Sequence, residues 1–590
     1  MPRPPPPKIV DGTPPEPSSV PETLIRVRPP GNGASRSADP AETRPCFASS
    51  WIRHVDNGPD ETVAEYDVCG VRVTIKSPRD ASYGIYSIDP PEYRLSHVHV
   101  QALAESIASV ASVMPRDLEI NSLATVGAYI KARAKDQLYS HLASRSTDEI
   151  AGLDLDRESE RLSEVLCRYT AGYGVLETLL RDSRVQDIYV DAPSSQTPVH
   201  VVLRSDSGSS VRQKCRTNVY VGRRDLQALV SRVKFETGLP FSEAHPVLEA
   251  DIRRLGARVT LVGPPLSDKG VSVAIRKHAT AIWSITGLVA NETLSPLVAS
   301  FLWACVVGRR TVLVAGSRGA GKTTLLGAMM LEFPLSQRII LIEDTPELSA
   351  GRMQALGYDV QALRFSGTKD EGAASAQEAL RVSLRMGESA IVIGEVRGQE
   401  AKVLYESMRA GSAGSSVLGT IHGNSAKGVL DRAVEDLGVS ERAFSSTDIV
   451  VVIGLIRSPD GSRFSRRVVE VAEVRESDHG VELVQLFSTT PGCACAKPTE
   501  EFSPSCKTVR GIAEALGMSG QEVVDVIKTR AHADQVVVES PRAKDSPGTL
   551  LGDEFRVRSN EVLTKAILSA SEPEAGLREW REWFDGVRST

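Results

Sequence analysis

The sequence predicts an α/β protein in which a doubly wound domain follows a smaller α/β domain. Short apolar runs alternate with helical patterns from about residue 294 to residue 474, as in a parallel sheet covered by helices on both faces. A glycine-rich turn separates the first of these runs from the next helical pattern. The 590 residues also exceed the roughly 250–300 that one hydrophobic core supports, so at least two domains are expected.

Three segments precede the smaller α/β domain. Residues 1–45 are rich in proline, serine, glycine and charge, and we expect disorder because little apolar surface is available to offset the entropy of ordering. Residues 46–97 alternate apolar and polar positions, as in VRVTI at 71–75, and predict a small β-containing unit. Residues 98–169 repeat apolar positions near every 3.6 residues and predict a helical region.

Residues 170–280 predict the smaller α/β domain, because strand patterns surround one amphipathic helix. That helix is expected at 225–238 and ends at Gly238. The expected strands are 185–191, 199–203, 257–263 and 270–278, and the last two form a hairpin.

Residues 281–480 predict the doubly wound domain, and residues 481–590 a polar tail of mixed and helical character. In the tail, 509–531 predicts two short helices around Gly517. The strands expected to be buried on both faces of the sheet are 311–315, 338–342, 390–394 and 416–421. A last apolar run, 448–456, predicts another strand.

Composition and charge argue against several classes of protein. The 75 acidic residues nearly balance the 69 basic ones and aromatic residues make up 5%, whereas a nucleic-acid motor needs a basic groove or stacking platforms. No nucleic-acid partner is therefore expected.

The longest apolar stretch, Leu297 to Val307, is shorter than a membrane-spanning helix. The N-terminus lacks the apolar core of a secretory signal and eight cysteines do not make a disulfide scaffold, so we expect a cytoplasmic protein.

The strongest motif is GSRGAGKT at 316–323, which fits G-x-x-x-x-G-K-[ST] and lies between a strand and a helix. Its glycines let backbone N–H groups turn toward phosphate oxygens, and the helix N-terminus adds positive charge. We expect Lys322 to reach the β- and γ-phosphates of ATP and the Thr323 hydroxyl to bind Mg²⁺. The expected nucleotide-binding residues are Gly316, Ser317, Arg318, Gly319, Ala320, Gly321, Lys322, Thr323 and Thr324.

Three other strands of the same domain also end in reactive side chains. Glu343 follows the strand 338–342, Glu395 follows 390–394 and His422 follows 416–421. Because ligands bind beyond the carboxyl ends of such strands, we expect these groups near the γ-phosphate. Glu395 would then hold Mg²⁺ or its water, and Glu343 would orient or deprotonate the attacking water. The alternative is that each carboxylate caps the next helix and that His422 is an ordinary hydrogen-bonding histidine.

An arginine from a neighbouring domain or subunit often meets the charge of a transferred phosphate. The candidates in the preceding domain are Arg254, Arg258 and Arg276, and those in the doubly wound domain are Arg381, Arg385 and Arg409. The alternative for each is a surface ion pair.

Four segments in this order resemble the type II/type IV secretion system ATPase superfamily. They are GSRGAGKTT at 316–324, IEDTPEL at 342–348, IVIGEVRGQEA at 391–401 and GTIHG at 419–423. The family's Walker A, Asp box, glutamate-type Walker B and His box map to Lys322 with Thr323, to Glu343 with Asp344 and Glu347, to Glu395, and to His422. Residues 173–191 and 428–461 resemble the archaeal type IV pilus-assembly branch in particular.

The resemblance implies a RecA-like P-loop NTPase motor domain preceded by a smaller α/β N-terminal domain. It implies a homohexamer that hydrolyses ATP at the cytoplasmic face of the membrane, with each nucleotide between one N-terminal domain and a neighbour's motor domain. Arg254, Arg258 or Arg276 would then close the site. Such a motor acts on a polytopic membrane platform protein and, through it, on pilin-like substrates. The alternatives are a conjugation-type secretion or archaellum ATPase, and a nucleotide-controlled scaffold with negligible turnover.

A cluster of cysteines in the tail raises the question of zinc. The cluster is Cys493, Cys495 and Cys506, and His479 or Cys46 would be needed as a fourth ligand. Free thiols in a loop are the alternative that we favour.

Overall fold

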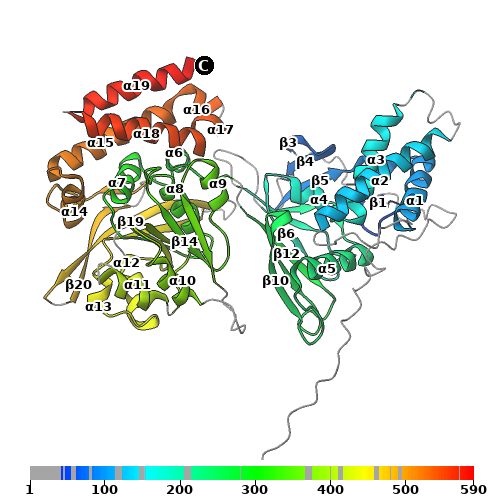
Figure 1. The fold of residues 1–590 in the computed structure, drawn as a ribbon, viewed down its shortest axis with the longest axis horizontal. Helices are drawn as coiled ribbons and strands as arrows, with labels where there is room; N and C mark the ends of the chain where they lie inside the picture. The colour runs from blue at the N-terminus through cyan, green and yellow to red at the C-terminus, as the bar shows by residue number, and fades with distance from the viewer. Residues whose placement is uncertain are drawn as a thin grey trace, which may run out of the picture. The chain divides into compact units, whose positions relative to one another are not determined.

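A computed structural model describes residues 42–43, 45, 47–54, 61–78, 83–112, 123–144, 152, 154–204, 214–278, 281–365, 375–398, 400–409, 416–457, 464–478, 480–489, 495–545, 547–570 and 572–589. The chain divides into two compact units, Met1–Lys277 and His278–Thr590 (Figure 1). Most of the segment expected to be disordered, 1–45, lies outside the described residues. Its end is ordered, because Glu42–Thr43 (β1) pairs with Trp51–Arg53 (β2).

Nine described strands form one sheet in the first unit, in the order β10-β11-β12-β6-β7-β8-β5-β4-β3. Their bounds are β3 Glu61–Val68, β4 Val71–Ser77, β5 Gly84–Asp89, β6 Val185–Val190, β7 His200–Leu203, β8 Lys214–Thr217, β10 Val247–Ile252, β11 Ala257–Val262 and β12 Ser272–Lys277. The sequence places 46–97 and 170–280 in separate units, whereas the structure joins them where β5 pairs with β8. One shared core explains the joining, because Val73 and Tyr86 pack with Val185 and Ile188.

Helices complete the first unit. The region 98–169 contains α1 His97–Ser112, α2 Leu123–Ala143 and α3 Leu155–Thr170, which share a core of their own. Asp154 caps α3 by accepting from the amides of Asp156 and Arg157. The short helix α4 spans Leu176–Arg181, and α5 spans Arg223–Thr237 and ends at Gly238 with φ +67°, as the sequence predicts. Val219–Tyr220 (β9) extends the small β1-β2 sheet.

The second unit also has nine described strands in one sheet, in the order β15-β14-β16-β17-β13-β18-β19-β20-β21. The six strands from β15 to β18 are parallel to their neighbours, and the remaining pairs are antiparallel. Their bounds are β13 Val312–Gly316, β14 Ile339–Glu343, β15 Val360–Arg364, β16 Ala390–Ile393, β17 Val417–His422, β18 Ile449–Arg457, β19 Phe464–Ser477, β20 Gly480–Ser488 and β21 Lys497–Pro498.

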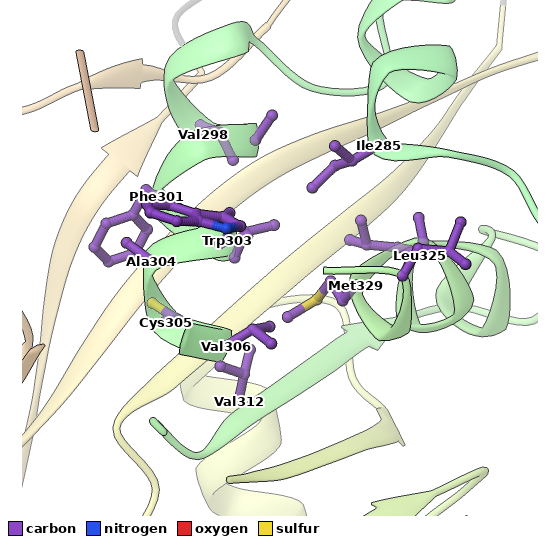
Figure 2. Close-up of a cluster of buried hydrophobic side chains, with 14 of the residues drawn as sticks. Ile285, Val298, Phe301, Trp303, Ala304, Cys305, Val306, Val312, Leu325 and Met329 are labelled. Atoms are coloured by element: carbon purple, nitrogen blue, oxygen red, sulfur yellow. The ribbon is translucent and has the colours of Figure 1, made fainter. Parts of the chain in front are cut away.

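Helices cover both faces of this sheet, as the alternating residues of β13 require. Val312 and Val314 pack with α6 Ile285–Ala290, α7 Pro296–Val307 and α8 Lys322–Met330. Figure 2 shows Phe301, Trp303 and Val306 of α7 beside Leu325 and Met329 of α8. Leu313 and Ala315 pack with the helices of the opposite face, which are α10 Ala376–Ser383, α11 Glu400–Arg409, α12 Ala426–Asp431 and α13 Glu441–Phe444. The predicted α/β fold, with a RecA-like P-loop NTPase domain and a smaller α/β N-terminal domain, is confirmed.

The tail, which the sequence sets apart at 481, belongs to the same compact unit. Strand β20 continues the sheet across that boundary, and the tail helices lie over α6 and α7 (Figure 1). Trp580 and Phe584 of α19 are fully buried in the common core, which is why these helices dock. The helices are α14 Lys507–Leu516, α15 Gly520–Glu539, α16 Pro541–Asp545, α17 Pro547–Leu550, α18 Asp553–Ser569 and α19 Pro573–Ser589. Among the described helices, none combines the length and apolar composition needed to cross a membrane.

Candidate functional site

The glycine-rich loop closes tightly between β13 and α8. Gly319 and Gly321 have φ of +79° and +101°, a region that side-chain-bearing residues rarely adopt. A Cβ on Gly316 would stand 2.6 Å from the carbonyl oxygen of Ile453, so only glycine fits there. The loop presents Ser317, Arg318 and Gly319 to solvent and buries Ala320, while Thr324 is exposed on the first turn of α8.

Lys322 begins α8 and its ammonium group turns back into the loop. Nζ donates to the carbonyls of Gly316 at 3.1 Å and Ser317 at 3.2 Å. Burial lowers the pKa of Lys322, because the charged form is partly desolvated. Nζ also lies 3.4 Å from Nδ1 of His422, which stands opposite Gly316 in the β13–β17 register. The lysine thus lies where phosphate oxygens would meet both the loop and the end of β17.

His422 links this lysine to Glu395. Its Nε2 lies 2.8 Å from Oε1 of Glu395, which follows β16 by two residues. Burial and the nearby Lys322 charge lower the pKa of His422 below its ordinary value of 6.5. A neutral imidazole accepts from Lys322 at Nδ1 and donates from Nε2 to Glu395, which fixes its tautomer. Lys322, His422 and Glu395 therefore form one hydrogen-bonded chain across three neighbouring strand ends.

Glu343 ends β14 and is 5% exposed. Its Oε1 accepts from the amides of Glu347 at 3.1 Å and Leu348 at 3.0 Å. Burial raises the pKa of Glu343 to about 7. Gly394 makes room for it, since a Cβ at that position would stand 2.9 Å from Cγ of Glu343. Backbone amides hold this carboxylate, as the capping alternative expects, but they belong to the loop before α9 Ala350–Ala355 and not to a helix.

Three further contacts connect these strand ends. Oγ1 of Thr323 donates to Oε2 of Glu347 at 2.8 Å. Arg397 pairs with Asp344, and its Nη1 lies 3.9 Å from Oε2 of Glu395. Hydroxyl and carboxylate oxygens are the ligands that Mg²⁺ prefers, so Thr323 and Glu395 fit the role predicted for them, and Glu347 adds a further oxygen beside Thr323.

One neighbour of the loop has no counterpart in the sequence motifs. Arg466 of β19 donates from Nε to the carbonyl of Gly319 at 3.1 Å. No spacing signals this contact, because it depends on how β19 folds back beside β18.

The arginines predicted to close the site from the preceding domain all have partners within the first unit. Arg254 pairs with Glu236 at 3.0 Å and lies over the ring of Tyr173. The remaining pairs are Arg258 with Glu249 at 3.1 Å and Arg276 with Asp187 at 3.8 Å. In the second unit, Arg381 is exposed on α10, Arg385 is exposed just after that helix ends, and Arg409 ends α11. A finger role for any of these arginines stays a prediction.

The cysteine cluster is described only in part. Cys493, Cys46 and His479 lie outside the described residues. Cys495 lies 3.4 Å from the carbonyl of Glu292, and Cys506 is buried at the start of α14. Across the described ranges, no group of three or more His, Cys, Asp and Glu side chains is arranged to hold a metal ion. Free thiols, rather than zinc, at the complete cluster stay a prediction.

Comparison with known proteins places these features in a family. The family model described as "Type II/IV secretion system protein" matches residues 170–540. A putative conjugal transfer protein of Mycobacterium tuberculosis is 27% identical over 337 residues, which cover 56% of this chain and 92% of that protein. The type IV secretion system protein PtlH of Bordetella pertussis is 34% identical over 262 residues, which cover 38% of this chain and 74% of that protein.

Archaeal relatives and solved structures are also similar. An uncharacterized protein of Methanocaldococcus jannaschii is 29% identical over 250 residues, covering 42% of this chain and 88% of that protein. The VirB11 ATPase of the Brucella suis type IV secretion system aligns with a TM-score of 0.25 at 24% identity, covering 50% and 92% of the two chains. The Legionella pneumophila ATPase DotB aligns with a TM-score of 0.35 at 14% identity, covering 60% and 87%. The family match confirms the resemblance predicted from the motifs: the chain belongs to the type II/IV secretion system protein family.

Proposed function

We propose that the chain is an ATP-hydrolysing motor that works as a homohexamer. The observation that carries the proposal is the chain of contacts from Lys322 through His422 to Glu395 beside the glycine-rich loop. The loop amides and Lys322 would hold the phosphates of ATP, and Thr323 and Glu395 would hold Mg²⁺, which neutralises phosphate charge when bound. The remaining loop residues, Gly316 to Gly321 and Thr324, would shape the phosphate cradle.

The chemistry is attack of water on the γ-phosphorus, with cleavage of the bond to the β-phosphate oxygen and release of ADP and phosphate. Glu343 is suited to orient the water and take its proton, because its pKa of about 7 lies near the working pH. His422, which is neutral and fixed in tautomer, would respond to the γ-phosphate and transmit that change to Lys322 and Glu395 through its two hydrogen bonds. An arginine of a neighbouring subunit (Arg254, Arg258 or Arg276) would meet the transferred charge after leaving its present ion pair.

The work done by the motor is the assembly of type IV pilus-like filaments or protein export through a polytopic membrane platform protein. The chain would act at the cytoplasmic face of the membrane, held there by that partner, and on pilin-like substrates only through it. The second candidate is conjugation-type secretion, which the name of the mycobacterial relative, a putative conjugal transfer protein, favours. A scaffold without turnover is disfavoured, because it has no need for Glu343, Glu395 and His422 at one sheet edge.

The test is Mg²⁺-dependent ATP hydrolysis by the purified chain from nanomolar to micromolar concentration. We expect the rate per protomer to rise with concentration, because the complete site needs a neighbouring subunit. Lys322→Ala and Glu395→Gln are expected to be inactive, and Arg442→Gln, at an exposed position of α13, serves as the control. Turnover that survives Lys322→Ala, or a rate per protomer independent of concentration and assembly, would contradict the proposal.

A further inference from the structure

Arg466 lies beside the phosphate-binding loop, on a strand that follows it by more than a hundred residues. Gly316 pairs with Ile453 of β18, and Ile453 pairs with Val468 of β19. Because β19 runs antiparallel to β18, Arg466 lies two residues past Val468 toward the carboxyl edge of β13. Residues two apart in a strand share a face, and Val468 packs in the core that contains Ala320 and Leu325. The side chain of Arg466 therefore emerges on the face that carries the loop.

The contacts of Arg466 join it to the backbone of the loop. Its Nε donates to the carbonyl of Gly319 at 3.1 Å. Its Cδ lies 3.1 Å from where a Cβ of Gly321 would stand, so the glycine makes room for the arginine stem. These contacts use one donor nitrogen of the guanidinium, which carries five N–H groups in a fixed fork.

The charge of Arg466 has no carboxylate partner among the described residues. Burial lowers the pKa of Arg466, and no neighbouring acid offsets that effect. The next residue differs: Arg467 pairs with Glu292 at 2.8 Å and also donates to its carbonyl oxygen. A half-buried guanidinium that is fixed beside a phosphate-binding loop and lacks an acid is suited to an anionic ligand.

The position of Arg466 identifies which part of that ligand it meets. Glu343 ends β14, His422 ends β17 and Glu395 follows β16. These three strands lie on one side of β13, whereas β18 and β19 lie on the other. We propose that Arg466 binds the phosphate groups that ADP and ATP share, from within the same subunit as the loop. This inference rests on the proposed function, since it assumes a nucleotide in the loop. Arg466 is then a nucleotide-binding residue of the ground state and not a finger for the γ-phosphate.

The experiment measures binding of ADP and of inorganic tripolyphosphate to the full chain by calorimetry, together with kcat and KM for ATP. The variants are Arg466→Gln, which keeps a donor but loses the charge, and Arg466→Lys, which keeps the charge. Arg467→Gln is the matched control on the same strand. Loss of one charge-assisted hydrogen bond predicts about tenfold to hundredfold weaker binding of both ligands by Arg466→Gln. We expect KM for ATP to rise with it, kcat to change less than about threefold, Arg466→Lys to recover part of the affinity, and Arg467→Gln to bind normally.

If the wild type binds both ADP and tripolyphosphate, any one of three results would overturn the inference. Unchanged affinities in Arg466→Gln would show that the arginine only braces the loop. Weaker binding of ADP with unchanged tripolyphosphate binding would show that Arg466 contacts the adenine base and not the phosphates. Loss of kcat with unchanged ADP affinity would make it a γ-phosphate finger. If wild type binds neither ADP nor tripolyphosphate, the proposed function itself fails, and the inference with it.

Discussion

Replacing Glu343 with glutamine should stabilise the chain at alkaline pH while it abolishes ATP hydrolysis. The carboxyl is 5% exposed and its pKa is raised to about 7 by burial. Glutamine has nearly the same shape, and its carbonyl oxygen can still accept from the amides of Glu347 and Leu348. The substitution therefore removes a desolvated charge and keeps the hydrogen bonds.

The size of the effect follows from the two pKa values. The ordinary pKa is 4.5 and the folded pKa is about 7, so the folded state keeps a proton that the unfolded chain has lost. The stability that this proton contributes is present below pH 4.5 and is lost as the pH rises through 7. Relative to a neutral side chain, the Glu343 carboxyl therefore lowers the free energy of unfolding by about 3 kcal/mol at pH 8 and by under about 1 kcal/mol at pH 5. The gain from Glu343→Gln should show the same pH dependence.

Urea unfolding at the two pH values measures this gain, with the fluorescence of Trp303 and Trp580 as a probe of the second unit. The control is Glu522→Gln. The amide of Ser519 lowers the pKa of Glu522, so this variant should not be stabilised at alkaline pH. Equal stability of wild type and Glu343→Gln at pH 8, or a larger gain at pH 5 than at pH 8, would refute the reasoning.

Two other substitutions test contacts at the two ends of α8, where Gly321 precedes the helix and Glu332 follows it. Glu332 accepts from Arg556 at 2.7 Å and from Arg530 at 3.1 Å, and all three side chains are at most 2% exposed. Glu332→Gln should cost about 3–5 kcal/mol in urea unfolding, because two buried guanidiniums lose a counter-charge, and a loss under about 1 kcal/mol would contradict this. Gly321→Ala forces a side chain into φ +101° and against Arg466, so we expect about 1–3 kcal/mol lower stability and weaker ADP binding by calorimetry. Unchanged ADP affinity would contradict that expectation.

The parts of the fold that sequence could predict are those with a local pattern. Residues 339–342 and 390–393 are short apolar runs that are buried throughout, and such runs are typical of strands covered on both faces of a parallel sheet. The loop at 316–323 is specified by glycines whose backbone angles other residues avoid. Ligands bind beyond the carboxyl ends of parallel strands, so the positions of Glu395 and His422 directly after two such strands predict that their side chains lie close together.

The parts that sequence did not predict depend on contacts between distant segments. The pairing of β5 with β8 joins residues about 130 positions apart, and neither strand signals its partner. The tail helices show amphipathic spacing, but nothing in that spacing says that Trp580 is buried and donates to Ser559 of α18. Arg466 is one of many arginines in the sequence, and only the register of β18 against β19 brings it to Gly319.

The central claim is that this site hydrolyses ATP, and the fate of bound nucleotide tests it most directly. Wild type, Lys322→Ala and Glu395→Gln are incubated with labelled ATP and Mg²⁺ at micromolar protein, and the bound nucleotide is recovered and identified. The account predicts ADP from wild type, intact ATP from Glu395→Gln, and little bound nucleotide from Lys322→Ala. Intact ATP recovered from wild type after hours would contradict the account and favour a scaffold that binds ATP without turning it over.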